Sequence, residues 1–301
     1  MATASPTSLR PGLWRRLLRR PAARAALTLL AGILLCTLFL PLLLNADPHA
    51  TSPAALEAPN STHLFGTDVN GRDLLARTLE GARISILVGL SGALVSLFIG
   101  TSCGLIAGYV GGRTDALLMR LVEVLYAIPR LILIILATFA LDPLLQRWLA
   151  PIQQGRWLGY SKIAILILAL GCIEWLTMAR IVRGQVLSLK TLPFVQAAQA
   201  LGQSHSRILL RHLLPNLSGI VIVYLTLTVP AVMLDESFLS FLGLGVQAPQ
   251  ASWGTLLSDG AQALNPIHSH WWLLLFPAAA MSLTLLALNF LGDALRDALA
   301  E

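Results

Sequence analysis

Charged side chains within long apolar runs are the residues of this sequence most able to do chemistry. The set consists of Glu123, Arg130, Glu174, Asp235 and Glu236. A charge in lipid costs at least about 2.5 kcal/mol, so such residues are candidates for contact with a transported solute or for passing protons. Glu123 and Arg130 are spaced to share one face of an ideal helix, whereas Asp235 and Glu236 are expected near water at the end of a span. Alternatively, these groups pair inside a bundle or line an aqueous cavity.

A second candidate is the polar stretch "VQAAQALGQSHSRILLRHLLPN", which lies between two apolar runs. Pro193 suits the first turn of a helix. Four residues then recur on one helical side, with Gln196 elsewhere: Phe194, Ala197, Ala198 and Leu201. Gly202 permits a chain reversal at the end of that helix, and Pro215 marks entry into the next apolar run. The pattern predicts a short helix with a small-residue face that docks another surface, or else a solvated helical loop.

Neither a metal site nor a nucleotide site is predicted. The piece "GTDVNGRD" fails as a calcium loop because Asp73 stands where glycine is required and Leu79 where glutamate is required. His268 and His270 have no third ligand nearby. The phosphate-binding pattern G-x-x-x-x-G-K-[ST] does not occur in the sequence. The chain is therefore expected to be no enzyme and to bind no metal or cofactor itself.

Composition indicates the elements that must position these residues. Of 301 residues, 56% are hydrophobic and 12% are charged, and the mean hydropathy is +0.73. Soluble domains carry about a quarter charged residues, so the sequence predicts an all-α polytopic membrane protein. The net charge is +6, but the basic residues are not gathered into one broad stripe. Their distribution argues against a nucleic-acid partner.

Hydropathy predicts about six membrane-spanning helices, each needing about 20 apolar residues. They are expected at 25–44, 84–109, 116–141, 163–180, 217–234 and 272–291. The resulting organisation is a basic tail at 1–24, a first span at 25–44, a loop at 45–81 and a core domain at 82–301. A signal peptide is the alternative for the N-terminus, but its apolar run is too long for one.

Arginine and lysine in the loops predict the orientation. The tail 1–24, the turn at 111–115, the loop at 185–215 and the C-terminus are richer in these residues than the loops on the other side. Positive residues concentrate on the cytoplasmic side of membrane proteins. Both termini and the 185–215 loop are therefore expected in the cytoplasm.

The order Gln196-Ala197-Ala198, three residues, Gly202, nine residues, then His212-Leu213-Leu214-Pro215 resembles the EAA loop of ABC-importer permeases. Gln196 replaces the glutamate of that pattern and His212 replaces its isoleucine. The resemblance implies that the 185–215 loop is an ATPase-coupling loop. The coupling residues that it implies are Phe194, Gln196, Ala197, Ala198, Gly202, His212 and Pro215.

Further stretches, including "GLIAGYVGGRTDALLMRLVEVLYAIPR" and "DESFLSFLGLGVQAPQASWGTLLSDGA", are similar to dipeptide and oligopeptide permeases, specifically the C-type oligopeptide subunit. The resemblance implies a type I ABC importer (MetI-like) permease fold in the bacterial inner membrane. It also implies a homologous second permease, two cytoplasmic ATPase subunits that bind ATP and Mg²⁺, and an extracytoplasmic peptide-binding protein. The loop at 141–164 looks longer than is usual in that family.

Two other functions stay open from the residues alone. An ion-coupled transporter or channel would act without ATPase partners, and a membrane anchor or scaffold would transport nothing. The shortage of acidic residues in the spans and the absence of a visible inverted repeat disfavour a secondary transporter. An ATP-driven importer for short peptides is the function that the sequence favours.

Overall fold

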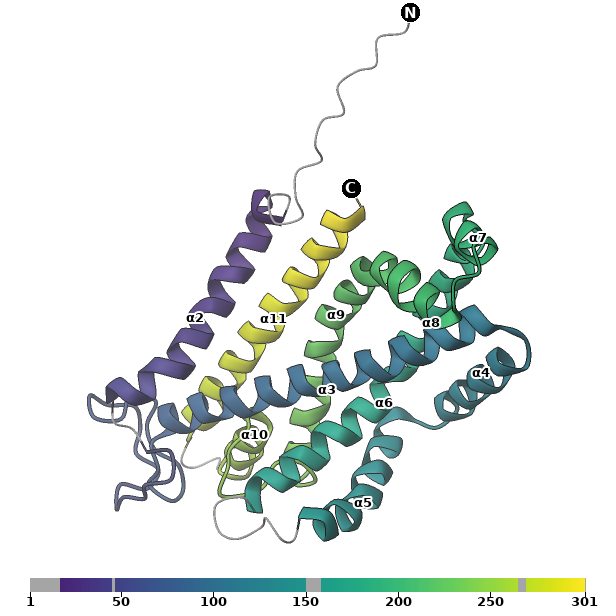
Figure 1. The fold of residues 1–301 in the computed structure, drawn as a ribbon. Helices are drawn as coiled ribbons and strands as arrows, with labels where there is room; N and C mark the ends of the chain where they lie inside the picture. Colours follow the sequence, from purple (N-terminus) through teal and green to yellow (C-terminus); the bar gives the residue numbers. More distant parts are fainter. Residues whose placement is uncertain (1–16, 45–46, 150–157, 265–268, 301) are drawn as a thin grey trace, which may run out of the picture.

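A computed structural model describes residues 17–44, 47–149, 158–264 and 269–300, and their regular secondary structure is helical throughout (Figure 1). The long helices are α2 (Pro21–Leu44), α3 (Leu74–Val110), α5 (Arg130–Leu149), α6 (Leu158–Leu189), α9 (Leu214–Phe241) and α11 (Trp272–Ala300). The shorter ones are α4 (Gly112–Tyr126), α7 (Pro193–Ala200), α8 (His205–Ile208) and α10 (Trp253–Gln262), with a π-helical turn, η2 (Leu209–Leu213), before α9.

Within these residues, five helical segments are long and apolar enough to cross a membrane, and the number is six if a bent pair counts as one span. This agrees with an all-α polytopic protein of about six spans. The helices extend beyond the expected limits; α3, for example, begins at Leu74, where the Asp73 side chain accepts a hydrogen bond from the Ala76 N–H. The helices α5 and α6 also reach into the 141–164 loop, of which 150–157 lie outside the described residues.

The third expected span, 116–141, is wrong as a single helix. It consists of α4 and α5, whose axes differ by 101° across a break after Tyr126. Pro129 explains the break, because proline lacks an N–H and keeps the residue before it out of the helical region. Glu123 and Arg130 therefore belong to different helices and do not share a face.

The helices α3 and α6 form the central pair of the bundle, and Figure 1 shows α3 running obliquely alongside α6. Gly100, Gly104 and Gly108 recur every fourth residue on the side of α3 that meets α6. A Cβ at Gly104 would lie 2.6 Å from the Ala179 carbonyl oxygen and 2.7 Å from the Val182 Cβ. Close backbone approach through small residues is a common way for helices to associate in membranes.

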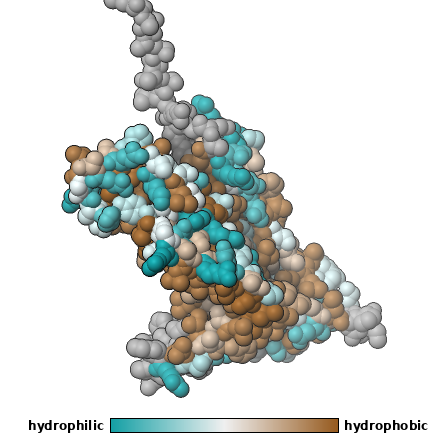
Figure 2. All heavy atoms as spheres, turned by 90° about the vertical axis from the view of Figure 1, so that its right-hand side faces the viewer, coloured by the Kyte–Doolittle hydropathy of each residue, from teal (hydrophilic) through white to brown (hydrophobic). Residues whose placement is uncertain are grey.

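The two ends of the bundle differ. Figure 1 places the start of α2, the end of α11 and α7 at one end, and the loop between α2 and α3 together with α10 at the other. The space-filling view of the side that carries α4 and α7 shows hydrophilic residues mainly in its upper part and hydrophobic residues dominating below (Figure 2). The end with α7 is the end that the sequence predicts to face the cytoplasm.

Asp68 organises the loop between α2 and α3. Its side chain is 3% exposed and accepts hydrogen bonds from the N–H groups of Asn70 and Arg72 at 2.8 and 2.9 Å. The guanidinium groups of Arg72 and Arg77 each lie 2.7 Å from it. Arg77 also reaches Asp259 of α10 at 3.2 Å. The ionised carboxylate therefore fastens the loop to α3 and, through Arg77, to α10.

We expect the order of this loop to depend on pH through Asp68. Burial alone would raise the pKa of Asp68, but the Arg72 and Asn70 N–H groups and the charges of Arg77 and Arg72 outweigh burial and hold this pKa below its usual range. The stabilisation is therefore complete above the unfolded pKa of about 4 and is lost as the pH falls through the lower folded pKa. Amide hydrogen-exchange protection over residues 52–73 should fall in the same way.

Asp68→Asn is the matched variant for this test. It should lower protection of residues 52–73 at neutral pH and leave little further loss on acidification. Equal protection in the variant and the unmodified chain at neutral pH would contradict a structural role for the charge.

Candidate functional site

The 193–203 segment forms the short helix and reversal that its sequence predicts. The helix α7 starts at Pro193. The Gly202 N–H donates to the Gln199 carbonyl at 2.9 Å, and the Gln203 N–H donates to the Ala198 carbonyl at 3.1 Å. This pair of bonds is the Schellman ending of a helix. Gly202 has a φ of +72°, a left-handed conformation that glycine adopts without steric cost.

Ala197 and Ala198 of α7 face different ways, which corrects the expectation that both lie on the docking side. Ala198, 4% exposed, and Val195, fully buried, pack in one hydrophobic cluster with residues of α3, α6 and α9. Ala197 is exposed, as are Phe194 at 39% and Leu201 at 80%. One side of α7 is thus joined to the spans, and the other is uncovered.

Polar contacts join the rest of this segment to the bundle. Gln196 is exposed and donates to the Thr191 carbonyl at 3.2 Å. The His212 ring lies 2.8 Å from the Gln203 side-chain oxygen, and Pro215 lies in the first turn of α9. The Tyr109 hydroxyl at the end of α3 is 2.8 Å from the His205 ring. These contacts link the reversal after α7 to η2, and α8 to the end of α3.

Three of the five intramembrane charges meet in one cluster, which we call the charge triad: Arg130, Glu174 and Asp235. The Arg130 Nη2 lies 2.5 Å from the Glu174 carboxylate and also contacts the Asp235 carboxylate. The Arg130 side chain is 46% exposed, and the two carboxylates are 11% and 14% exposed. The triad joins the start of α5, directly after the break at Pro129, to the middle of α6 and to the C-terminal part of α9.

The two other candidate charges do not join the triad. Glu123 lies on α4, 62% exposed, with its carboxylate 3.6 Å from Arg120. Glu236 is fully buried, so its expected place near water is wrong. It accepts hydrogen bonds from hydroxyl groups of α3 and α9: Ser85 at 2.9 Å, Ser237 at 3.2 Å and Ser240 at 2.7 Å. The Glu236 carboxylate thus joins α3 and α9 through hydrogen bonds.

A cavity of about 330 Å³ opens beside the triad and is lined by Arg130 and Glu174 together with residues that sequence reasoning missed. Among the latter are Tyr126 and Thr177, whose hydroxyl groups lie 2.5 Å apart. The Arg180 guanidinium, which is not part of the lining, lies 3.7 Å above the Tyr126 ring. Thr177 follows Glu174 by three residues along α6, a spacing that places the two side chains on neighbouring turns of one face and could have identified Thr177.

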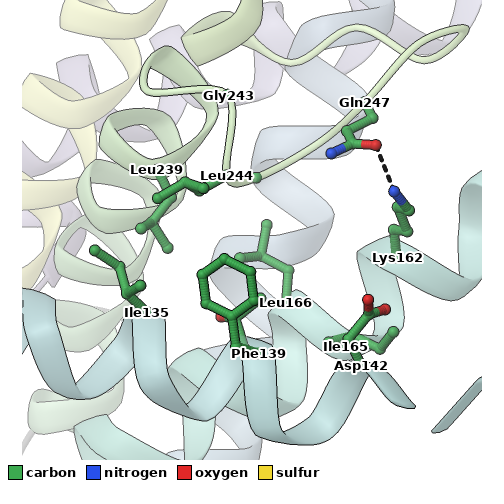
Figure 3. Close-up of a pocket in the computed structure, with 12 residues that line it drawn as sticks. Ile135, Phe139, Asp142, Lys162, Ile165, Leu166, Leu239, Gly243, Leu244 and Gln247 are labelled. Carbon is green, nitrogen blue, oxygen red and sulfur yellow. Dashed lines mark hydrogen bonds between the residues drawn. The ribbon is translucent and has the colours of Figure 1, made fainter.

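A second, smaller cavity of about 100 Å³ lies between α5, α6 and the loop after α9. Figure 3 shows Phe139 and Asp142 of α5, with Lys162 of α6 turned toward Gln247. The Lys162 ammonium donates a hydrogen bond to the Gln247 side-chain oxygen. Nothing local in the sequence indicates that Lys162 and Gln247, which are 85 residues apart, are neighbours.

No group of three potential metal ligands occurs among the described residues. His270 is described, with its ring 5.2 Å from that of Trp272, whereas His268 lies outside the described residues. Nothing in the described geometry therefore supplies the ligand set of a metal centre.

Comparison with known proteins gives a consistent result. Residues 100–301 match the family described as "Binding-protein-dependent transport system inner membrane component". Residues 9–59 match "N-terminal TM domain of oligopeptide transport permease C".

Relatives cover nearly the whole chain. The chain is 47% identical over 288 residues to the oligopeptide transport system permease protein OppC of Escherichia coli (strain K12), a match covering 95% of this chain and 88% of that protein. It is 43% identical over 290 residues to the dipeptide transport system permease protein DppC of Bacillus subtilis (strain 168), covering 95% and 83%. The chain therefore belongs to the binding-protein-dependent transport system inner membrane component family, in its dipeptide and oligopeptide permease group, with the MetI-like fold of a type I ABC-importer permease.

Proposed function

We propose that this chain is one of two membrane subunits of an ATP-driven importer of short peptides in the bacterial inner membrane, with both termini in the cytoplasm. It forms the translocation path with a homologous permease. Two cytoplasmic ATPase subunits, which bind ATP and Mg²⁺, act on it through the 185–215 loop, and an extracytoplasmic peptide-binding protein delivers the cargo. The named relatives are peptide permeases, which supports peptide as the cargo. The chain itself hydrolyses nothing and needs no cofactor.

The observation that carries this proposal is the two-sided character of α7. Val195 and Ala198 hold the helix to the spans, while Phe194, Ala197 and Leu201 form an uncovered side of apolar and small residues. An exposed side of this kind suits a groove on a partner subunit, because small side chains allow close approach of backbones. Energy released in the partner can then reach the spans through the buried side, by rigid-body motion between two states.

The exposed surfaces of α4 and α5 are evidence for a second membrane subunit. Large apolar side chains stand exposed along both: Leu117 at 73%, Val124 at 53%, Leu136 at 56% and Phe139 at 63%. Because Arg130 and its cavity lie at the break between these same helices, a homologous permease covering them would enclose a polar path. The lipid bilayer accounts for the exposed apolar side chains of α2 and α11, among them Leu35, Leu43 and Leu286.

Site-directed cross-linking tests the coupling. Ala197→Cys and Ala198→Cys are made in a chain whose three native cysteines are replaced by alanine, and a short photoactivatable thiol reagent is attached. We expect Ala197→Cys to capture an ATPase subunit in cells that import peptide, and Ala198→Cys, the buried neighbour, to capture at least tenfold less. The failure of Ala197→Cys to capture a nucleotide hydrolase in importing cells would overturn the proposal. Uptake by the purified chain in vesicles without ATP would instead support an ion-coupled transporter.

A further inference from the structure

The charge triad contributes side chains to two cavities. Arg130 and Glu174 line the cavity of about 330 Å³ between α4, α5 and α6. Asp235 lines another of about 430 Å³, with Leu131 of α5, Phe238 of α9 and Met281 of α11 in its wall. Arg130 and Asp235, which contact each other, thus stand one in the wall of each cavity. Walls that are otherwise largely apolar concentrate the electrostatic field of the triad, because they screen charge far less than water does.

The triad contains one more acidic group than basic groups. It holds two carboxylates and one guanidinium, and a single nitrogen, the Arg130 Nη2, makes both contacts. Within the part of the chain that the structure describes, Arg130 Nε and Nη1, Glu174 Oε2 and Asp235 Oδ1 make no hydrogen bond. The carboxylates are about nine-tenths buried, and a buried charge without a full set of partners is costly. Glu174 Oε2 and Asp235 Oδ1 are thus acceptors available to one further cation. Arg130 Nε and Nη1 are donors available beside them.

The walls next to these open atoms are held in place. The Tyr126 hydroxyl is bonded to Thr177, and the ring packs under the Arg180 guanidinium. Both Tyr126 and Thr177 line the same cavity as Glu174. A group entering this cavity therefore reaches the Glu174 carboxylate beside a fixed aromatic and hydroxyl wall. Such pre-arranged polar groups in a mostly apolar cavity are typical of ligand sites.

We propose that the charge triad binds the α-ammonium group of a peptide in transit, on the free oxygens of Glu174 and Asp235. The free guanidinium edge of Arg130 donates to the first backbone carbonyl of the same peptide. An ammonium group would be a second basic group for the two carboxyl groups, and it has three donors for the open acceptors. This inference rests on the proposed function, because it assigns a recognition step to the path of a peptide importer.

Equilibrium binding to the complete permease–ATPase complex in lipid nanodiscs, without the binding protein, tests the inference. The probes are trialanine and N-acetyl-trialanine, in which an uncharged acetamide group replaces the α-ammonium group. We expect the unmodified complex to bind trialanine at least tenfold more tightly than the acetylated peptide. The double variant Glu174→Gln, Asp235→Asn should bind the two peptides equally. Asp297→Asn is the matched control, since Asp297 is also ion-paired to an arginine, Arg20 at 2.6 Å, but lines neither cavity; it should keep the tenfold preference.

Each possible result either supports or overturns the inference. A preference for trialanine that survives in the double variant, or that is absent from the unmodified complex, overturns the inference, as does a double variant that binds neither peptide. Should that variant not assemble, judged by its basal ATP hydrolysis, the single variants Glu174→Gln and Asp235→Asn take its place, each with the preference expected to fall by threefold or more. ATP-dependent trialanine uptake by the unmodified complex with its binding protein is measured in parallel, and failure of that uptake would count against the proposed function instead.

Discussion

Gly202→Val is expected to abolish ATP-driven peptide uptake, to below a tenth of the normal rate, while the chain still inserts in the membrane. Gly202 has a φ of +72°. A residue with a Cβ pays roughly 1–2 kcal/mol in the left-handed region, and a β-branched residue is worse still. No other atom would crowd a Cβ at this position, so the whole effect comes from the backbone. The reversal after α7 would open, and Phe194, Ala197 and Leu201 would no longer be presented together. Uptake per inserted chain is the measurement.

Two further substitutions separate backbone conformation from bulk. Gly202→Asn should keep a substantial part of the uptake, because asparagine enters the left-handed region more readily than other residues with a side chain. Gly184→Ala, in a helix with open space around it, should have no effect. Normal uptake by a well-expressed Gly202→Val chain would show that the reversal is not needed for coupling.

Local sequence signals predicted those features that depend on neighbouring residues. The apolar runs predicted the spans, and Pro193 and Gly202 predicted the limits of α7. Proline and glycine do so because each determines the backbone conformation at its own position. The same rule applied at Pro129 would have predicted the break between α4 and α5. Hydropathy alone did not reveal it, because the apolar character continues across the turn and a window average cannot see a change of direction.

The charge triad shows what local signals cannot predict. Its members come from three helices and are separated by tens to more than a hundred residues along the chain, so only the packing of α5, α6 and α9 brings them together. The neighbours Asp235 and Glu236 make the same point. Successive residues of a helix point about 100° apart, and here one faces Arg130 while the other faces Ser85. Ala197 and Ala198 are separated in the same manner, one exposed and one buried.

Gly104→Leu is expected to prevent the chain from folding, with recovery of properly folded protein from the membrane falling at least tenfold. The Cβ alone would lie 2.6 Å from a carbonyl oxygen of α6 and 2.7 Å from the Val182 Cβ. Because the crowding involves the partner backbone, no side-chain rotation relieves it. Overpacking of a core typically costs about 1–3 kcal/mol where neighbours can adjust, and here α3 and α6 must separate along a shared length that includes Gly100 and Gly108. Separating these two helices costs free energy at or above the upper end of that range, which is a large part of a total stability of about 5–15 kcal/mol.

Gly32→Leu is the matched control, since Gly32 also lies in a spanning helix, α2, yet has no atom within 4 Å of a built Cβ. It should be recovered at a level close to that of the unmodified chain. Size-exclusion chromatography of detergent extracts, followed by thermal unfolding of the monodisperse fraction, compares the variants. Equal recovery and equal melting temperature for Gly104→Leu and Gly32→Leu would mean that α3 and α6 are not in close contact. In that case the buried side of α7, which packs on residues of this same pair, would have no rigid body to move.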